Sequence, residues 1–170
     1  MLLKTKKSGT GVALYIHESI NVTTLEKISE CSEGIECLFL QSTNTIVPIT
    51  FGFLYRPNDG NKEKFCDKLE NIFECLPSSN VYMMGDYNLN LLGKNASNKF
   101  EDTFMASGYN PRISTYTHER PGTKRSCIDN IFTNDIHNII SGTISDKMSH
   151  HLPAFQFSDI SPESQSGTTF

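Results

Sequence analysis

A glycine, an aspartate and an asparagine follow a short apolar run and could do acid–base chemistry. The run, residues 81–84, leads directly into Gly85-Asp86-Tyr87-Asn88. Residues two apart on an extended segment point to the same side, so we expect Asp86 and Asn88 to share one face at a strand end. A carboxylate can accept a proton from water while a neighbouring carboxamide holds that water. The alternative is that these residue types only form the turn that closes the strand.

A second acid and two adjacent histidines stand further along the chain. In residues 126–132, alternation places Asp129 and Ile131 on one face and the even-numbered residues on the other. An acid in such an apolar segment needs a partner, because an unpaired buried charge is costly; a salt bridge or a turn contact would also meet that need. The imidazoles of His150 and His151 suit the surface, a metal or catalysis. Paired with Asp129, His151 would be oriented and kept charged beside a phosphoryl oxygen.

Two further segments could hold phosphate. Tyr55 and Asn58 stand at the end of the longest apolar run, where a hydroxyl and an amide can donate hydrogen bonds; alternatively they are a rim aromatic and part of a turn. Residues 112–125 contain the single acid Glu119 and four bases: Arg112, Arg120, Lys124 and Arg125. We interpret this segment as a mobile basic loop that either contacts phosphate or is simply solvated.

The elements that must position these side chains are several strands and two helices. Apolar runs predict strands at 11–16, 35–41, 45–55 (with Pro48 at an edge or a bulge), 81–84, 126–132, 136–144 and 154–157. An apolar stripe of helical period predicts a helix over 62–76, and a shorter helix is expected over 99–107 with Asn98 as its cap. Strands with only two helices favour an α+β or layered α/β architecture with a mostly antiparallel sheet system.

Composition bounds the class of protein. The chain has 170 residues, 37% of them hydrophobic, which suits one packed domain and excludes a fibrous or wholly disordered chain. A net charge of −4 means that any nucleic-acid site must use a local basic surface or a metal. Five cysteines without a CxxC pair predict reduced, mostly buried thiols. Because the sequence shows neither a signal peptide nor a membrane span, we predict an intracellular protein, nuclear or cytoplasmic, that is not secreted.

The order of these segments resembles the endonuclease/exonuclease/phosphatase superfamily, and most of all the endonuclease domain of jockey-type non-LTR retrotransposons. The matching segments are 11–16, Tyr55-Arg56-Pro57, Gly85-Asp86-Tyr87-Asn88, 126–132 and Ser149-His150-His151-Leu152-Pro153. The resemblance implies a four-layered α/β sandwich, with two mostly antiparallel sheets face to face and helices outside. We expect the domain to span 1–157 and a polar tail to occupy 158–170.

The resemblance also implies an activity, which is Mg²⁺-dependent hydrolysis of a phosphodiester, with Mn²⁺ as a substitute. DNA would be nicked to prime a reverse transcriptase whose domain would lie downstream. Asp86 and Asn88 would activate the attacking water, and Asp129 would orient His151. Contacts to phosphate or DNA would come from Tyr55, Asn58, Thr117, Arg120, Lys124 and Arg125.

The chain departs from the family pattern at two points. The family has an Asn and a metal-binding Glu before the strand that matches 11–16, and only ten residues precede Gly11, so we expect an N-terminally truncated domain that lacks the opening strands. Where the family has Ser-Asp-His, this chain has Ser149-His150-His151, which puts His150 at an acid position near the metal. Mg²⁺ prefers oxygen ligands, so both departures predict an impaired enzyme. The alternatives are a non-catalytic module that binds nucleic acid or a partner and, ranked last, a phosphatase acting on lipids or sugar phosphates.

Overall fold

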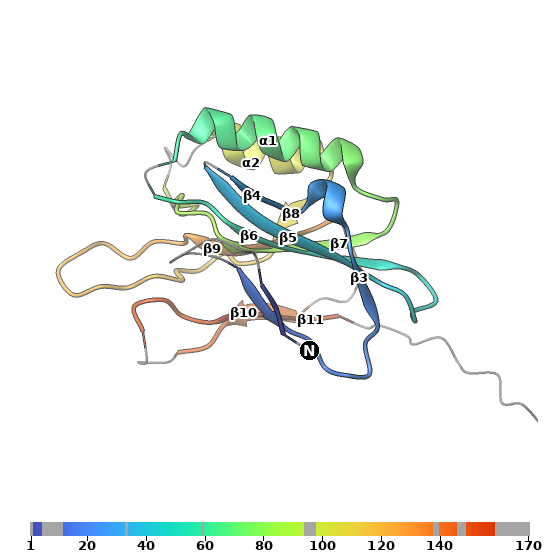
Figure 1. The fold of residues 1–170 in the computed structure, drawn as a ribbon. Coiled ribbons are helices and arrows are strands. Elements are labelled where there is room, and N and C mark those ends of the chain that lie inside the picture. The colour runs from blue at the N-terminus through green and yellow to red at the C-terminus, as the bar shows by residue number, and fades with distance from the viewer. Residues whose placement is uncertain are drawn as a thin grey trace, which may run out of the picture.

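The chain folds into a large sheet with helices on one face and smaller sheets on the other (Figure 1). The computed structural model describes residues 2–4, 12–32, 34–58, 60–93, 98–137, 140–145 and 149–158. Within these ranges, no helix is long and apolar enough to cross a membrane. Cys37, Cys66 and Cys127 are buried thiols and Cys75 is an exposed thiol, which confirms the prediction of reduced, mostly buried thiols for these four.

The large sheet has seven strands in the described residues, in the order β3-β5-β6-β7-β9-β8, with β4 also paired to β5. The strands are β3 Val22–Thr24, β4 Glu30–Ser32, β5 Ile35–Ser42, β6 Ile49–Tyr55, β7 Asn80–Asp86, β8 Asn110–Pro111 and β9 Asp129–Thr133. All neighbours are antiparallel except β6 and β7, which are parallel. A parallel pair requires a crossover connection, and the helix α1 (Lys62–Cys75) supplies it. A short 3₁₀ turn, Glu26–Ile28, lies between β3 and β4.

Both predicted helices form, and they pack on the same face of the large sheet (Figure 1). The side chain of Asn61 accepts a hydrogen bond from the Lys64 N–H at 2.9 Å and so begins α1, while Leu69 and Ile72 face the core. The second helix, α2, spans Asn98–Ala106. The helix begins at Asn98, and the side chain of this residue, the predicted cap, lies outside the described part of the structure.

The core between helices and sheet is built largely from aromatic rings. Phe104 and Phe132 stack with ring centroids 3.9 Å apart, and Tyr87 meets Phe132 edge to face at 5.4 Å. All three side chains are fully buried. The Tyr87 hydroxyl donates a hydrogen bond to the Met83 carbonyl oxygen at 3.1 Å, so its polar group is satisfied inside the core.

Two two-stranded antiparallel sheets cover the opposite face of the large sheet (Figure 1). One pairs β1 (Leu2–Lys4) with β2 (Ala13–Tyr15), and the other pairs β10 (Ile140–Thr143) with β11 (Ala154–Phe157). The predicted α/β sandwich of face-to-face sheets is therefore confirmed. In the described part of the chain the helices cover only the large sheet, so these residues form three layers of the four expected.

Several predicted strand boundaries are wrong for local reasons. The strand expected from residue 45 begins at Ile49, after Pro48, and β9 begins at Asp129 rather than at residue 126. The strands expected over 11–16 and 136–144 shrink to β2 and β10. Residues 159–170 of the expected tail lie outside the described residues.

Candidate active site

Two carboxylates meet where two central strands of the large sheet lie side by side. Asp86 is the last residue of β7, Asp129 is the first of β9, and the two are directly paired across the antiparallel ladder. Directly opposite residues share a face, so both side chains point to the side away from the helices. The residue before Asp86 must be glycine, because a Cβ at Gly85 would lie 1.7 Å from the Leu54 carbonyl oxygen.

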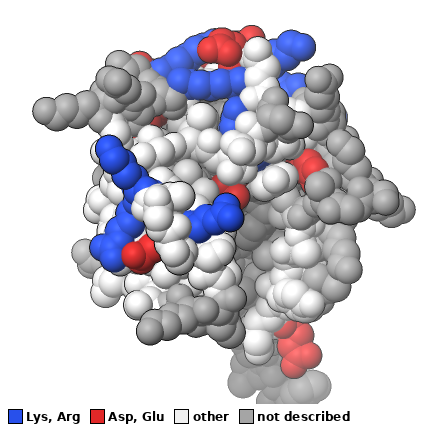
Figure 2. All heavy atoms as spheres, turned by 90° about the vertical axis from the view of Figure 1, so that its left-hand side faces the viewer, with Lys and Arg blue, Asp and Glu red and all other residues white. Residues whose placement is uncertain are grey.

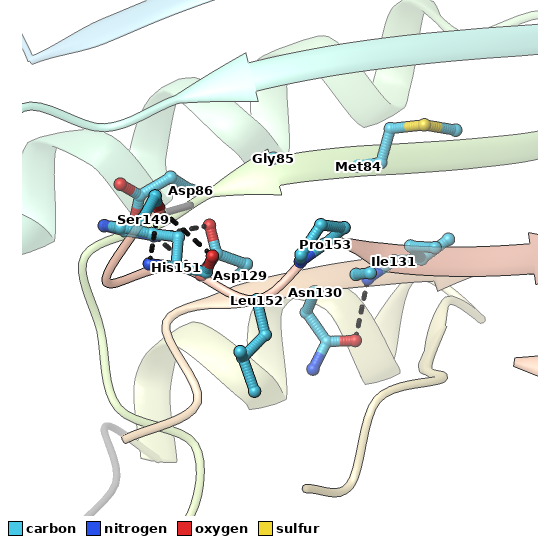
Figure 3. A pocket seen from close by; sticks show the side chains of 11 residues that line it. Met84, Gly85, Asp86, Asp129, Asn130, Ile131, Ser149, His151, Leu152 and Pro153 are labelled. Atoms are coloured by element: carbon cyan, nitrogen blue, oxygen red, sulfur yellow. Dashed lines mark hydrogen bonds and ion pairs between the residues drawn. The ribbon is translucent and has the colours of Figure 1, made fainter. Parts of the chain in front are cut away.

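His151 completes this group from a different segment of the chain. Its Nδ1 atom lies 3.0 and 3.2 Å from the two carboxylate oxygens of Asp129 (Figure 3). The Asp129 side chain is 20% exposed and that of His151 is 42% exposed, so the pair is half-buried at the rim of an open pocket of about 440 Å³. The predicted need of Asp129 for a partner is met by His151, and the imidazole is oriented from its Nδ1 side.

Thr117 holds the two segments of the pair together. Its Oγ1 atom accepts hydrogen bonds from the N–H groups of Ile128 (3.1 Å) and Asp129 (3.0 Å), and its carbonyl oxygen accepts one from the Leu152 N–H (2.7 Å). Thr117 is fully buried. In the structure this residue positions Asp129 and, through Leu152, the neighbouring His151, while the expected contact of Thr117 with DNA stays a prediction.

Asn88 lies next to Asp86 by a different route from the one predicted. The strand has ended, and Asn88 adopts a left-handed conformation with φ of 49°. Its N–H donates to Asp86 Oδ1 at 2.9 Å, and its side-chain amide donates to the Arg56 carbonyl oxygen at 2.8 Å. The two residues do not share a strand face as expected, because Asn88 forms a turn that steadies the Asp86 carboxylate.

The environment of Asp86 makes its carboxylate a stronger base than an ordinary aspartate. Burial raises the pKa of Asp86, and the negative charge of Asp129 raises it further. The N–H of Asn88 opposes this rise, as do the imidazoles of His151 and His118. A carboxylate with a raised pKa binds a proton more readily, which is the property that a general base needs.

The donor atoms in this group suit a divalent cation. One ligand atom from each of Asp86, Asp129 and His151 can be chosen so that all lie within 4.8 Å of one another. Carboxylate oxygens suit Mg²⁺ and Mn²⁺, and an imidazole nitrogen is tolerated better by Mn²⁺ than by Mg²⁺. His150, predicted at the metal, does not join this group; its side chain is exposed and its carbonyl oxygen accepts the Glu119 N–H at 2.9 Å.

Comparison with known proteins gives matches in structure only. Neither the family models nor the curated proteins match this chain. The endonuclease domain of TRAS1, a telomere-specific non-LTR retrotransposon, aligns with 91% of this chain and 76% of its own at a TM-score of 0.69 and 14% identity. An endonuclease/exonuclease/phosphatase family protein from Bacteroides thetaiotaomicron aligns with 91% of this chain and 71% of its own, at a TM-score of 0.63 and 15% identity. TDP2 from D. rerio, complexed with a single-strand DNA product, aligns with 89% of this chain and 72% of its own, at a TM-score of 0.60 and 14% identity.

The chain has the endonuclease/exonuclease/phosphatase fold. The resemblance predicted from the ordered motifs is thus confirmed at the level of the fold, including the likeness to a retrotransposon endonuclease domain. In this endonuclease/exonuclease/phosphatase fold, Asp86 at the end of β7 and Asp129 at the start of β9 gather with His151 in one group (Figure 3).

Within the segment interpreted as a basic loop, residues 117–126 form a folded arm beside this site. Thr117 and His118 both donate N–H bonds to the Ser126 carbonyl oxygen at 2.9 Å, which closes the arm as a hairpin rather than leaving it an open loop. Arg125 pairs with Glu119 at 2.8 Å and lies over the Tyr116 ring at 4.3 Å. Arg120 and Lys124 are exposed, and Figure 2 shows Lys and Arg side chains gathered on this end of the molecule.

The remaining predicted contacts occupy different positions. Tyr55 is half-buried and is paired with Asp86 across the parallel strands, so it adjoins the site, whereas Asn58 lies beyond the strand and is exposed. Arg112 is outside the arm, since its guanidinium bonds to the Asp135 carbonyl oxygen.

His118, which lies within residues 112–125, also borders the site. Its ring lies 4.9 Å from the ring of His151, centroid to centroid, and its backbone bridges to both Ser126 and His151. Only the pairing of these distant segments reveals that His118 borders the site.

Proposed function

We propose that this chain is a metal-dependent phosphodiesterase that nicks DNA. The observation that carries the proposal is the half-buried Asp129–His151 pair beside Asp86, whose pKa burial raises, at the rim of an open pocket. Hydrolysis of a phosphodiester needs a base for the attacking water and positive charge for the phosphoryl oxygens. This arrangement offers both within one group of residues.

Each side chain has a role that its contacts support. Asp86 accepts a proton from the attacking water, and the Asn88 N–H, at 2.9 Å from Oδ1, keeps the carboxylate in place. Asp129 holds Nδ1 of His151, which leaves Nε2 available to a phosphoryl oxygen, to which it donates when the ring carries a proton on both nitrogens. From the neighbouring strand, the Tyr55 hydroxyl donates a hydrogen bond to the phosphate.

Asp86 and Asp129 would hold the cation, which we take to be Mg²⁺ or Mn²⁺. When bound, such an ion polarises a phosphoryl oxygen and offsets the charge that develops on it. His150 offers no carboxylate near these acids, and imidazole is a poor ligand for Mg²⁺. We therefore expect weak activity with Mg²⁺ and stronger activity with Mn²⁺.

The arm next to the site supports nucleic acid as the substrate class. Arg120 and Lys124 are exposed, and no ion pair neutralises either one within the described part of the chain, so both are available to phosphates. The structural likeness to the TRAS1 endonuclease domain and to TDP2 in complex with a DNA product points the same way. A reverse transcriptase partner and an intracellular location belong to the same proposal.

Nicking of supercoiled plasmid, with Mg²⁺ and with Mn²⁺, tests the proposal. We expect slow nicking with Mg²⁺, faster nicking with Mn²⁺, and loss of both in Asp86→Ala. His150→Asp should raise the Mg²⁺ rate if the missing acid limits the metal. DNA binding at low salt without any nicking would overturn the proposal in favour of a non-catalytic binding module. Hydrolysis of small phosphoesters but not of DNA would favour a phosphatase.

A further inference from the structure

A third carboxylate lies in line with the site. The register pairs Glu36 on β5 with Tyr55 on β6, Tyr55 with Asp86 on β7, and Asp86 with Asp129 on β9. These four residues form one row across four adjacent strands, which we call the carboxylate row. Directly paired residues point to the same face of a sheet, so Glu36 faces the side that carries Asp86 and Asp129.

Burial on β5 supports this orientation. The neighbours Ile35 and Cys37 belong to the aromatic core under the helices, so the residue between them points to the opposite face. Glu36 is only 1% exposed, although it is an acid. Because Glu36 lies within an apolar strand, the sequence alone does not indicate that it could bind a ligand.

One oxygen of the Glu36 carboxylate lacks a partner. Its Oε2 atom is buried and accepts no hydrogen bond from the described part of the chain. No described lysine or arginine forms an ion pair with it. The buried base that follows β6, Arg56, directs its guanidinium to the carbonyl oxygens of Asn88 and Gly60 instead. An acid in this state is costly unless a positive charge joins it.

A cation at the carboxylate row would supply that charge. Neighbouring strands lie about 4.8 Å apart, so the backbones of Glu36 and Asp86, with β6 between them, are separated by about 10 Å. Tyr55 lies between the two acids in the row, and the described ligand atoms within 4.8 Å of one another come from Asp86, Asp129 and His151. Glu36 would therefore reach an ion at Asp86 by turning its longer side chain toward it or through one of the waters that Mg²⁺ keeps.

We propose that Glu36 is an acidic ligand of the divalent cation that Asp86 also binds, either directly or through one water of the ion. The inference rests on the proposed function only for the presence of a cation at Asp86, since binding does not require turnover. It adds an oxygen donor to a site whose other described donors are two carboxylates and an imidazole. Glu36 would thus make up part of the deficit of acids that His150 leaves.

Direct titration with Mn²⁺, followed by the loss of the free-ion signal in electron paramagnetic resonance, tests the inference. We compare the unmodified chain with Glu36→Gln and with the matched control Asp135→Asn. Asp135 is also a buried acid, but it is bound by the Tyr82 hydroxyl and lies outside the carboxylate row. We expect Mn²⁺ binding to weaken about tenfold or more in Glu36→Gln and to stay unchanged in Asp135→Asn.

Thermal unfolding of the same proteins separates a ligand from a merely structural residue. Without metal, Glu36→Gln should unfold at the same or a higher temperature than the unmodified chain, because an unpaired buried charge has been removed. With Mn²⁺, the unmodified chain should gain stability and Glu36→Gln should gain much less. Equal Mn²⁺ affinity in the two proteins would overturn the inference, even if plasmid nicking succeeds. Mn²⁺ binding that depends on Glu36 without any nicking would sustain it while the proposed function fails.

Discussion

The two faces of the large sheet are built from the same strands but serve different ends. On β7 and β9, Met83 and Phe132 point into the aromatic core, whereas Asp86 and Asp129 line the pocket on the other side. The first face is fully buried and apolar. On the second face, Asp86 and Asp129 are only partly buried, and burial raises the pKa of Asp86. The period of two along each strand is thus enough to separate residues that hold the fold from residues that do chemistry.

The contrast shows that the groups unfavourable for folding stability are concentrated on the pocket face. The helix-covered face gains free energy by burying rings, and its polar groups, such as the Tyr87 hydroxyl, are satisfied. The pocket face keeps acids near one another and near imidazoles, an arrangement that stability alone does not favour. Substitutions on the two faces should therefore separate stability from activity.

The largest effect we expect is on activity, from Asp129→Asn. The amide keeps the shape of the side chain but removes the negative charge that lies against Nδ1 of His151 and orients its ring. Nicking should fall by about 10²- to 10⁴-fold. The free energy of unfolding should change by less than about 1 kcal/mol, because the pair is partly solvated. Plasmid nicking and urea unfolding measure the two quantities, and a large loss of stability would contradict the contrast.

A comparable effect on stability should come from Phe132→Ala on the helix-covered face. Removing this ring opens a cavity among Tyr87, Phe100 and Phe104, at a cost of about 3 to 5 kcal/mol. Calorimetry should show a melting temperature lower by about 2 to 4 °C for each kcal/mol. Below that temperature the folded fraction should still nick DNA. The matched control is Ile131→Val on the pocket face, which should cost only about 0.5 to 1.5 kcal/mol.

Thr117→Val should affect both properties to a moderate degree, because Thr117 joins the fold to the site. The substitution removes the acceptor of two N–H groups, those of Ile128 and Asp129, and should cost about 1 to 3 kcal/mol. Nicking should also fall, since Asp129 loses its anchor. Thr117→Ser retains the hydroxyl and should restore most of both. A Val variant as active and stable as the unmodified chain would remove Thr117 from the account.

The smallest effect concerns Tyr82, a polar residue of the pocket face that lies away from the site. Burial and the Asp135 carboxylate raise the pKa of Tyr82 to about 12, above the value near 10 of an exposed tyrosine. The folded state then holds a proton that the unfolded state loses, so stability falls as pH rises from about 10 to 12. Tyr82→Phe should be less stable at pH 7, by about 1 kcal/mol, yet lose less stability above pH 10. Urea unfolding at both pH values checks this, and parallel alkaline losses would contradict it.

The sequence predicted most of what local pattern controls. The helix over 62–76 and the strands over 35–41 and 154–157 appear within about a residue of their predicted bounds, because their apolar periods agree with their burial in the fold. The motifs around Asp86, Asp129 and His151 could also be found in the sequence, because their residue types and their order along the chain match the family pattern. Asn88 was misjudged because its left-handed turn depends on an amide contact with Arg56, 32 residues away in sequence.

Features that depend on pairing between distant segments could not be predicted. The sequence shows Glu36 only as part of a core strand, whereas the register of β5, β6 and β7 places it in one row with Tyr55 and Asp86. The role of Thr117 depends on main-chain groups 11 and 12 residues later. His118 acquires its place only through the bridge to His151. In each case the decisive contact is long-range, and no local pattern encodes it.

Parallel measurement of DNA nicking and thermal unfolding in Asp86→Asn tests the central claim most directly, namely that the pocket face does the chemistry while the other face holds the fold. The account predicts that nicking with Mn²⁺ falls at least about a hundredfold. Without metal, the melting temperature should stay the same or rise, because a carboxylate whose pKa is raised by burial has been replaced by a neutral amide. Unchanged nicking, or a clear drop in melting temperature, would contradict the account.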